Sequence, residues 1–381
     1  MEEKGKVKKI LQIVSCLELG GTEAFIMNNY RVLNRSEYQF DFAVFCEKDY
    51  PYSDEINQLG GHIYFVGTPS FYNIHKFIKH FKEVVAEGGP YVAVHSHVNI
   101  GNAIPLLAAN LCGIPIRVSH SHDTSGKDTS LIKKPWTCIK EHLIKKHATA
   151  FLSCSKEAGE YLYGKEFFSE KGSVIPNGID VKSFFNERDS EVEVLRKEFS
   201  IKENCPLVVG NISRFEEKKN SLFTVKIFNE ILNRIPEAIL IMGGPDGGQL
   251  EACKNLARIL GIEKSVRFIG ERTDVPTCLK LIDIYLFPSL FEGLGIVLLE
   301  AQASGCFCAA SDGVSTEVDQ GLNSVRFISL KKNEAEWAKE IMESFNTWGK
   351  KLPEEILKKY IESGYEINES HKELMRIYNG E

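Results

Sequence analysis

Residues 284–301 read IYLFPSLFEGLGIVLLEA. The first four residues form an apolar run with the length of a buried strand, and Pro288 and Ser289 end it. After Gly295 the run becomes helical in character. A strand that passes through a tight turn into a helix is the unit from which doubly wound parallel sheets are built. The stretch therefore predicts an α/β fold.

The same stretch carries a candidate binding site. Gly293 and Gly295 leave backbone N–H groups uncovered at the helix start, and such groups attract anions such as phosphate. The carboxylates of Glu292 and Glu300 would repel a phosphate and suit hydroxyl groups better. A nucleotide-sugar supplies both phosphate and hydroxyls. The alternative is an amphipathic helix whose two acids are simply solvated.

Strand and helix patterns alternate along the whole chain, which predicts parallel sheets covered by helices on both faces. In the first half we expect strands at 10–15, 40–46, 63–66, 92–96, 117–120 and 150–154, with helices at 23–33, 74–86 and 131–147. In the second half we expect strands at 207–212, 238–242, 266–269, 284–287 and 307–310, with late helices at 354–363 and 367–378.

The charge-rich stretch 186–204 lies between these two series of strands. We therefore predict two doubly wound, Rossmann-like domains, an N-terminal one at 1–185 and a C-terminal one at 186–365. The last segment, 366–381, is expected to form a helix that packs back on the N-terminal domain.

The composition is that of a soluble globular protein, with 43% hydrophobic and 26% charged residues. A net charge of -6 argues against a general nucleic-acid binder. No stretch approaches the roughly 18 to 20 apolar residues that span a bilayer, and no secretion signal is recognisable, so we expect a cytoplasmic protein. Many of the ten cysteines sit in or beside apolar runs, and none belongs to a zinc-type pair with a second ligand pair. We expect them to be buried free thiols.

Cations follow two strands of the second series. Arg214 and Lys219 come just after the strand at 207–212, where they are well placed to meet a diphosphate, with the arginine able to bind it as a fork. A solvated loop is the alternative. Arg272 follows the strand at 266–269 and could lie against a base, although that segment is equally explicable as a connection.

Two further groups of residues follow strands of the first series. Gly20, Gly21 and Thr22 open the first helix, where adjacent glycines allow a ligand to approach the backbone, or where they simply form a tight turn. Histidines occur as two His-Ser-His units, 95–97 and 120–122. An H-x-H in a strand points both rings the same way, which allows metal binding, but no third ligand can be assigned. Our preferred role for these rings is a hydrogen bond to a sugar hydroxyl.

These motifs together resemble one family. The matching elements are Gly20-Gly21-Thr22, the turn Pro176-Asn177-Gly178-Ile179-Asp180, Arg214 with Lys219, and the E-x₇-E spacing from Glu292 to Glu300. In this order, over nearly the whole chain, they resemble the retaining glycosyltransferases of family 4, which have the GT-B fold. The E-x₇-E spacing is the most specific element. Residues 120–124 and 289–302 are similar to the branch that makes capsular polysaccharides and exopolysaccharides.

The resemblance implies two domains that face across a cleft and a nucleotide-sugar donor, with UDP as the expected nucleotide. It implies that Arg214 and Lys219 hold the diphosphate, that Glu300 holds the ribose hydroxyls and that Glu292 faces the transferred sugar. The backbone amides of Gly293, Leu294, Gly295, Ile296 and Val297 would lie near the phosphates. Asn220 departs from the family pattern, because many members have glycine there.

The resemblance also assigns the first-domain residues and the chemistry. His120 or His122 would be the catalytic histidine of the cleft, with His120 favoured, and His97 would bind substrate with Gly20, Gly21 and Thr22. No metal or other cofactor is expected, because the leaving diphosphate helps to deprotonate the acceptor on the same face of the sugar. The acceptor would be a glycan or a lipid-linked molecule.

The segment 131–147 combines lysines with Trp136, Ile139 and Leu143, and Pro135 is expected near its helix start. This composition suits an interfacial helix on anionic lipid, which predicts a protein peripheral to the inner leaflet. An ordinary helix with one core face is the alternative.

Two other functions remain open from the sequence. A nucleotide-sugar epimerase of the same architecture would need extra acid–base groups in the cleft. A non-catalytic sugar-nucleotide sensor would show loss of a motif residue, whereas Glu292, Glu300, Arg214 and Lys219 are all present.

Overall fold

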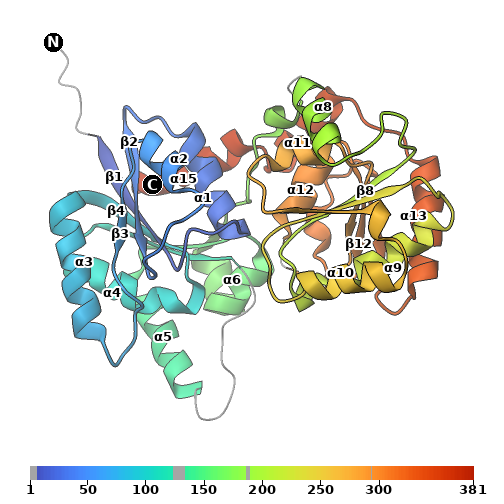
Figure 1. The fold of residues 1–381 in the computed structure, drawn as a ribbon. Helices are drawn as coiled ribbons and strands as arrows, with labels where there is room; N and C mark the ends of the chain where they lie inside the picture. The colour runs from blue at the N-terminus through green and yellow to red at the C-terminus, as the bar shows by residue number, and fades with distance from the viewer. Residues whose placement is uncertain (1–6, 123–133, 186–188, 293) are drawn as a thin grey trace. The chain divides into compact units, whose positions relative to one another are not determined.

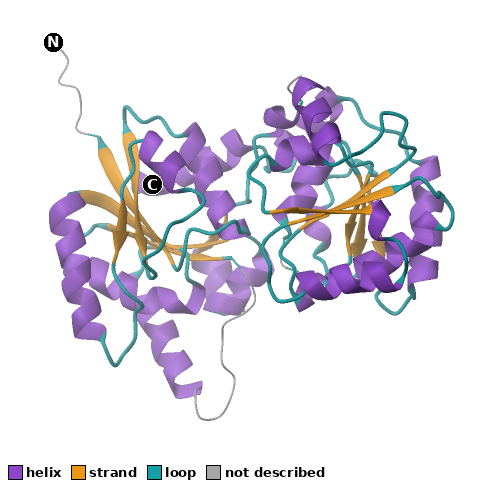
Figure 2. Cartoon of the chain, viewed as in Figure 1, coloured by secondary structure: helices purple, strands orange, loops and turns teal. Residues whose placement is uncertain are grey.

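A computed structural model describes residues 7–122, 134–185, 189–292 and 294–381. The chain forms two compact units. The first consists of Met1–Gly178 together with Ile367–Glu381, and the second of Ile179–Glu366. In each unit a twisted sheet lies between helices (Figures 1 and 2).

The first unit contains a seven-stranded parallel sheet in the order β3-β2-β1-β4-β5-β6-β7. Its strands are β1 (Lys8–Val14), β2 (Tyr38–Val44), β3 (Ile63–Phe65), β4 (Tyr91–Ser96), β5 (Ile116–Ser121), β6 (Ala150–Ser153) and β7 (Gly172–Val174). Its α-helices are α1 (Gly21–Val32), α2 (Ser53–Gln58), α3 (Ile74–Gly88), α4 (Ala103–Leu111), α5 (Lys134–His147), α6 (Lys156–Tyr163), α7 (Lys165–Lys171) and α15 (Ile367–Tyr378).

Both faces of this sheet are buried, as the near-continuous apolar strands require. Ile10 of β1 packs in a core with α1 and α15. Its neighbour Leu11 packs in a second core with α3 and α4. Successive side chains of a strand point to opposite faces, so a strand buried on both faces is apolar at most of its positions.

The second unit contains a six-stranded parallel sheet in the order β10-β9-β8-β11-β12-β13. Its strands are β8 (Val208–Ile212), β9 (Ile239–Gly243), β10 (Val266–Gly270), β11 (Ile284–Phe287), β12 (Phe307–Ser311) and β13 (Val325–Ile328). Its α-helices are α8 (Asp189–Glu198), α9 (Ser221–Leu232), α10 (Leu250–Ile259), α11 (Val275–Lys280), α12 (Ile296–Ala303), α13 (Glu334–Thr347) and α14 (Pro353–Glu362).

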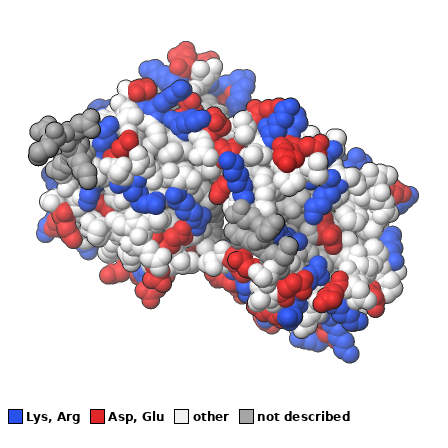
Figure 3. Space-filling view, turned by 90° about the horizontal axis from the view of Figure 1, so that it is seen from above, with Lys and Arg blue, Asp and Glu red and all other residues white. Residues whose placement is uncertain are grey.

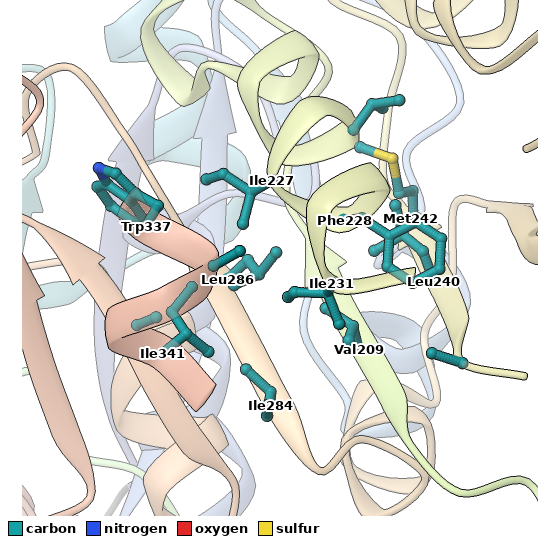
Figure 4. Close-up of a cluster of buried hydrophobic side chains, with 14 of the residues drawn as sticks. Val209, Ile227, Phe228, Ile231, Leu240, Met242, Ile284, Leu286, Trp337 and Ile341 are labelled. Atoms are coloured by element: carbon teal, nitrogen blue, oxygen red, sulfur yellow. The ribbon is translucent and has the colours of Figure 1, made fainter. Parts of the chain in front are cut away.

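A dense apolar core joins this second sheet to α9 and α13 (Figure 4). Trp337 of α13 is fully buried, and its indole N–H donates to the carbonyl of Ser329 at 3.0 Å. Ile227 and Ile231 of α9 reach the same core, which also takes side chains from β8, β9 and β11. The core fixes the strands whose carboxyl ends carry the site.

The predicted α/β fold and the predicted strands are confirmed, and the short strands β7 and β13 are additional. β11 and α15 have the predicted limits. β7 is a three-residue edge strand that contains Gly172 and Ser173, so it lacks an apolar run. β13 is also an edge strand and carries an exposed Arg326, which interrupts its apolar pattern.

The junction between the two units differs from the predicted one at 185/186. It falls between Gly178 and Ile179, because Ile179 pairs with Glu366 and the following short helix Val181–Phe184 contacts α11, α12 and α14. Gly178 packs closely on α15, where a Cβ atom would lie 2.2 Å from Oγ of Ser370. The C-terminal helix belongs to the first unit and contacts α1.

All ten cysteines are free thiols. Cys306 and Cys308 are buried as expected, but Cys46 and Cys138 are exposed. The expectation of burial is wrong for those two, because each lies beyond or outside the apolar face of its element.

Acidic and basic side chains are interspersed over the face shown in Figure 3. Such mixing is typical of a solvated protein surface. Within the described ranges, every helix is too short or too polar to cross a membrane.

Candidate functional site

Two loops of the second unit are tied together where the neighbouring strands β8 and β11 end. The amide of Leu290 donates to the carbonyl of Lys218 at 2.8 Å. The Asn220 side-chain amide donates to the carbonyl of Pro288 at 3.1 Å. The predicted cation loop and the predicted carboxylate loop therefore lie against each other.

Asn220 gives the loop before α9 its backbone conformation. Its backbone has φ 56° and ψ 41°, the left-handed conformation. Glycine enters that region freely, and asparagine is one of the few other residues that enters it at low cost. The loop before α9 is therefore built with a side chain that also ties it to the β11 loop.

Lys219 and Glu292 form an ion pair between these loops. Their side chains are only 15% and 16% exposed, so water screens the pair weakly. The Lys219 ammonium also lies 5.0 Å from the ring centroid of Phe287. The Glu292 amide donates to the carbonyl of Gly313 at 3.0 Å, which fixes the backbone that carries the carboxylate.

The start of α12 is an uncapped helix N-terminus. Gly295 is the N-cap residue with φ 68°, and it supplies no side-chain cap. The first amides of α12 therefore lack an intrahelical acceptor. Leu294 and Ile296 bury their side chains, so only their backbone could meet a ligand. Gly293 lies outside the described residues.

Glu300 lies one turn into α12 on the same face as Val297. Both are partly exposed, whereas the other residues of the helix are buried. Residues three apart on a helix are neighbours, so the carboxylate lies along the face that begins at the uncapped amides.

Arg214 follows β8 and lies beside the loop after β9. The amide of Phe215 donates to the carbonyl of Pro245 at 2.9 Å, and the amide of Gly247 donates back to Phe215 at 3.1 Å. Gly244 has φ 135°, and a Cβ atom there would lie 2.2 Å from the carbonyl oxygen of Ser213. Only glycine permits this approach, which positions the backbone that carries Arg214.

Arg272 is held in a network of ion pairs. Its guanidinium donates two hydrogen bonds to Asp274, at 2.8 and 2.6 Å, and one to Glu198 at 2.7 Å. The hydrogen bond from Arg272 lowers the pKa of the Asp274 carboxyl. These three hydrogen bonds use three of the five N–H groups of the guanidinium, so a contact with a base would not require either carboxylate to be given up.

In the first unit, Gly20 is the N-cap of α1 and has no side-chain cap. A Cβ atom at this position would lie 2.6 Å from Oε2 of Glu23, which is the end of a flexible side chain and can move away. Gly21 is exposed and Thr22 partly exposed. This places a second uncapped helix start at the carboxyl end of β1.

The two His-Ser-His units lie on the adjacent strands β4 and β5 and form one cluster. As predicted, both rings of each unit point the same way, with ring centroids 4.0 Å apart for His95 and His97 and 4.1 Å apart for His120 and His122. Phe25 of α1 packs edge-on against His120 at 5.0 Å.

A continuous series of hydrogen-bond contacts links these rings through Gln12 of β1 and Tyr378 of α15. The contacts are His120 Nδ1 to His95 Nε2 (3.1 Å), His95 Nδ1 to the Tyr378 hydroxyl (2.6 Å), that hydroxyl to Gln12 Nε2 (3.1 Å), Gln12 Oε1 to His97 Nε2 (2.9 Å) and His97 Nδ1 to His122 Nε2 (2.8 Å). We call this series the histidine chain.

Burial favours the neutral form of three of these rings. It lowers the pKa of His95, His97 and His120 well below the usual value, and the neighbouring histidines lower it further. His120 is fully buried, whereas His122 is partly exposed. Surface exposure alone would therefore favour His122, and not the predicted His120, as the residue that meets a ligand.

A metal site was the alternative interpretation of these histidines. His95, His97 and His120 do each place a nitrogen within 4.8 Å of the others, and neutral imidazole is the form that metals bind. Both ring nitrogens of His95 and of His97, however, already have hydrogen-bond partners in the protein. A metal on these nitrogens would therefore replace hydrogen bonds of the histidine chain.

Sequence reasoning missed Gln12 and Tyr378 as members of this cluster. Gln12 offered one signal, because it is a polar residue inside an otherwise apolar strand. Tyr378 had no local signal, since its position depends on how the last helix packs.

Comparisons with known proteins identify the family. Residues 192–365 match the family described as "Glycosyl transferases group 1", and residues 20–178 match the "Glycosyl transferase 4-like domain". The chain is 32% identical over 375 residues to a putative glycosyltransferase, EpsF, from Bacillus subtilis, covering 98% of this chain and 96% of that protein. The chain belongs to the group 1 glycosyl transferases.

Other relatives of this glycosyltransferase carry related names. The capsular polysaccharide biosynthesis glycosyltransferase CapH of Staphylococcus aureus is 27% identical, covering 97% of this chain and 98% of that protein. An Escherichia coli enzyme named as a UDP-Gal:α-D-GlcNAc-diphosphoundecaprenol α-1,3-galactosyltransferase is 27% identical, covering 77% of this chain and 76% of that protein.

Solved structures show that this glycosyltransferase has the GT-B fold. Anabaena HepE in complex with UDP has a TM-score of 0.76 at 16% identity, covering 99% of this chain and 100% of that one. HepE in complex with UDP-glucose has a TM-score of 0.76 at 17% identity, covering 98% and 100%. A glycosyltransferase from Rickettsia africae has a TM-score of 0.78 at 15% identity, covering 98% of each chain.

Proposed function

We propose that this glycosyltransferase moves a sugar from a UDP-sugar to a glycan or lipid-linked acceptor in cell-surface polysaccharide synthesis, with retention of the anomeric configuration and without a metal. The names of CapH and of the E. coli galactosyltransferase support the pathway, the donor and the acceptor class. The UDP complexes of HepE support the same nucleotide.

The observation that carries the donor site is the joined pair of loops after β8 and β11. It places the Lys219–Glu292 ion pair beside the uncapped start of α12. A diphosphate would be met by an ammonium group and by helix amides, both of which bind anions. Arg214 would complete the anion site, and Glu300 would accept hydrogen bonds from the ribose hydroxyls.

The ion pair also suggests how the two loops respond to the donor. A diphosphate carries more negative charge than one carboxylate, so it competes with Glu292 for the Lys219 ammonium. When Lys219 turns to the diphosphate, Glu292 becomes able to accept a hydrogen bond from the transferred sugar. Each residue thus keeps the other's charge compensated until the donor binds.

The chemistry needs no metal in this proposal. The bond between the anomeric carbon and the diphosphate oxygen breaks, and the acceptor oxygen bonds to the same carbon from the same face. The acceptor's hydroxyl proton passes to the leaving diphosphate. Lys219, Arg214 and the α12 amides stabilise the negative charge that develops on the diphosphate, which is the largest usual source of catalysis in such sites.

A membrane-facing role for α5 fits a lipid-linked acceptor. Trp136 is 51% exposed and Ile139 is 43% exposed, and both lie on one side of the helix. Lys145 and Lys146 are exposed in its last turn. Exposed aromatic and aliphatic groups beside lysines suit the surface of an anionic bilayer, which would place the protein at the cytoplasmic membrane face.

Vesicle sedimentation tests the α5 assignment. Wild-type protein should sediment with vesicles that contain anionic lipid, and a Trp136→Ser/Ile139→Ser variant should remain in the supernatant. Equal sedimentation of both proteins, or no binding by either, would remove the membrane role and leave the donor site unaffected.

Donor specificity is tested by thermal unfolding with UDP-, GDP- and ADP-sugars, followed by turnover with a polyprenyl-diphosphate-linked glycan. We expect stabilisation by UDP-sugars and an acceptor-dependent product whose anomeric configuration matches the donor, read by NMR. An inverted product would refute retention. Isomerised donor without acceptor would indicate an epimerase, and binding without turnover would indicate a sensor.

A further inference from the structure

The histidine chain has a definite pattern of proton positions, because Gln12 sits in its middle. A glutamine amide is an acceptor at oxygen and a donor at nitrogen, and neither role can be exchanged without turning the group over. A neutral imidazole carries one N–H and one bare nitrogen. Fixing one contact therefore fixes the next along the chain.

The branch that leads to His122 follows from the Gln12 oxygen. That oxygen accepts, so His97 Nε2 carries the proton and donates to it at 2.9 Å. His97 Nδ1 is then bare and accepts from His122 at 2.8 Å. His122 must therefore be protonated at Nε2, which leaves its Nδ1 without a proton.

The branch that leads to His120 follows from the Gln12 nitrogen. That nitrogen donates to the Tyr378 hydroxyl oxygen at 3.1 Å. Among the described residues, the acceptor within reach of the hydroxyl proton is His95 Nδ1 at 2.6 Å, so the proton is directed there. His95 then carries its own proton at Nε2 and donates it to His120 Nδ1 at 3.1 Å. His120 is consequently protonated at Nε2.

One atom at the end of this branch lacks a partner. The Nε2 atom of His120 is buried and makes no hydrogen bond with the protein. A buried donor without an acceptor is unfavourable, so structures rarely keep one without a reason. An oxygen atom placed against Nε2 would complete the histidine chain.

If the Gln12 amide were turned over, every proton in the chain would move to the other ring nitrogen. His120 would then end in a bare nitrogen and His122 in an N–H. The chain thus has two fully neutral arrangements, and the orientation of one amide selects between them. Burial favours the neutral form of His95, His97 and His120, so a charged intermediate on these three rings is disfavoured.

We propose that Gln12 and Tyr378 are positioning residues that hold all four histidines in one tautomer, with Nε2 protonated and Nδ1 bare, so that His120 ends the chain as a hydrogen-bond donor. The consequence for catalysis rests on the proposed function. In a sugar transferase, the Nε2–H of His120 is the group that would donate to a sugar oxygen. The proposal also gives α15 a role in the site through its Tyr378 hydroxyl.

The direct test is the tautomer of each ring, read by long-range ¹H–¹⁵N NMR of histidine-labelled full-length protein. We expect His95, His97, His120 and His122 all to be protonated at Nε2. Any of the four protonated at Nδ1, or exchanging between the two nitrogens, would overturn the proposal. Stoichiometric Zn²⁺ in the purified protein, bound by these rings, would overturn it as well.

Two variants test the positioning roles. In Tyr378→Phe, His95 and His120 should exchange between tautomers while His97 and His122 stay protonated at Nε2. In Gln12→Glu, the carboxylate accepts on both sides, so His95 and His120 should move to Nδ1–H and the other two rings should not change. Unaltered spectra in Tyr378→Phe would refute the role of the hydroxyl, even where Gln12→Glu does not fold.

The matched control is Tyr38→Phe. It removes a hydroxyl that also contacts the C-terminal segment, donating to Asn379 at 2.6 Å, but that lies outside the histidine chain. We expect kcat/KM of the transfer reaction to fall about 10-fold in Tyr378→Phe, as for a lost productive hydrogen bond, and to change little in Tyr38→Phe.

The tautomer measurement and the activity measurement test different claims, and each claim can be refuted without the other. If the NMR pattern is as expected but no nucleotide-sugar is turned over, the proposed function is wrong and the tautomer assignment stands. If transfer proceeds but the two tyrosine variants lose equal activity, the catalytic consequence of the tautomer is refuted.

Discussion

Acid should destabilise the first unit far more steeply than the second, because His95, His97 and His120 are buried as neutral rings. Burial lowers their pKa in the folded protein from the usual value of 6.5. A base whose pKa is lowered by folding stabilises the fold above its unfolded pKa. That stabilisation is lost as the pH falls below about 6.5, where the unfolded chain takes up protons that the folded chain does not.

The magnitude follows from the number of protons. One pH unit corresponds to about 1.4 kcal/mol for each proton that binds only the unfolded chain. Well below pH 6.5, three rings therefore give a slope of about 4 kcal/mol per pH unit. The unfolded rings bind few protons above pH 6.5, so the total loss of stability between pH 7.5 and 5.5 is also about 4 kcal/mol. Such a loss is a large part of the 5–15 kcal/mol that typically stabilises a domain.

The assay must separate the two units, because the chain does not have to unfold in one step. We would titrate the protein with urea at pH 7.5 and 5.5, and follow each titration with a short deuterium pulse at one fixed pH and mass spectrometry. The exchange pattern reports the unfolding of β4 and β5 separately from that of β8 and β11. His97→Gln should remove about a third of the slope that these three rings contribute, while His147 and His371, whose pKa burial also lowers, keep theirs. His75→Gln, at an exposed position of α3, is the control and should leave the slope unchanged. Equal pH dependence of both units would refute the burial of neutral histidines.

Three substitutions in the second unit have expected outcomes of their own. Glu300→Ala should weaken UDP binding about 10-fold by calorimetry through loss of the ribose contacts, and unaltered affinity would remove that assignment. Asn220→Gly should unfold at nearly the wild-type urea concentration. Asn220→Val should lose about 1–2 kcal/mol of unfolding free energy, because a branched residue resists the left-handed conformation. Equal stability of the two variants would contradict the backbone argument. Gly244→Ala should destabilise the second unit by more than 1 kcal/mol in the same titration, since its Cβ would meet the Ser213 carbonyl, and a neutral result would show that the loop can move.

The sequence predicted those parts of the fold that depend on local pattern. β11 is a continuous apolar run, so its limits at Ile284 and Phe287 could be read directly. The two rings of each His-Ser-His unit were expected on one side, because side chains in a strand repeat every two residues. The turn at Gly295 was predicted from its glycine, which is the residue that enters the left-handed region most easily.

Features that depend on tertiary packing could not be predicted from local pattern. Tyr378 is 366 residues from Gln12, and its hydroxyl reaches the histidine chain only because α15 packs on the first sheet. The pairing of Lys219 with Glu292 depends on β8 and β11 being neighbours in the sheet. The sequence gives strand ends, but not the order of strands that brings these side chains together.

The central claim is that the joined loops after β8 and β11 bind the donor diphosphate and stabilise its charge during sugar transfer. The most direct measurement is acceptor-dependent turnover of a UDP-sugar by wild type, Lys219→Ala and Lys218→Ala. Lys218 lies next in sequence and pairs with Glu216 at 3.5 Å, so its variant is a matched loss of charge. We expect Lys219→Ala to lower kcat/KM by at least 100-fold at unchanged folding, and Lys218→Ala to lower it less than 5-fold. Equal activity of the two variants, or full activity in Lys219→Ala, would contradict the account.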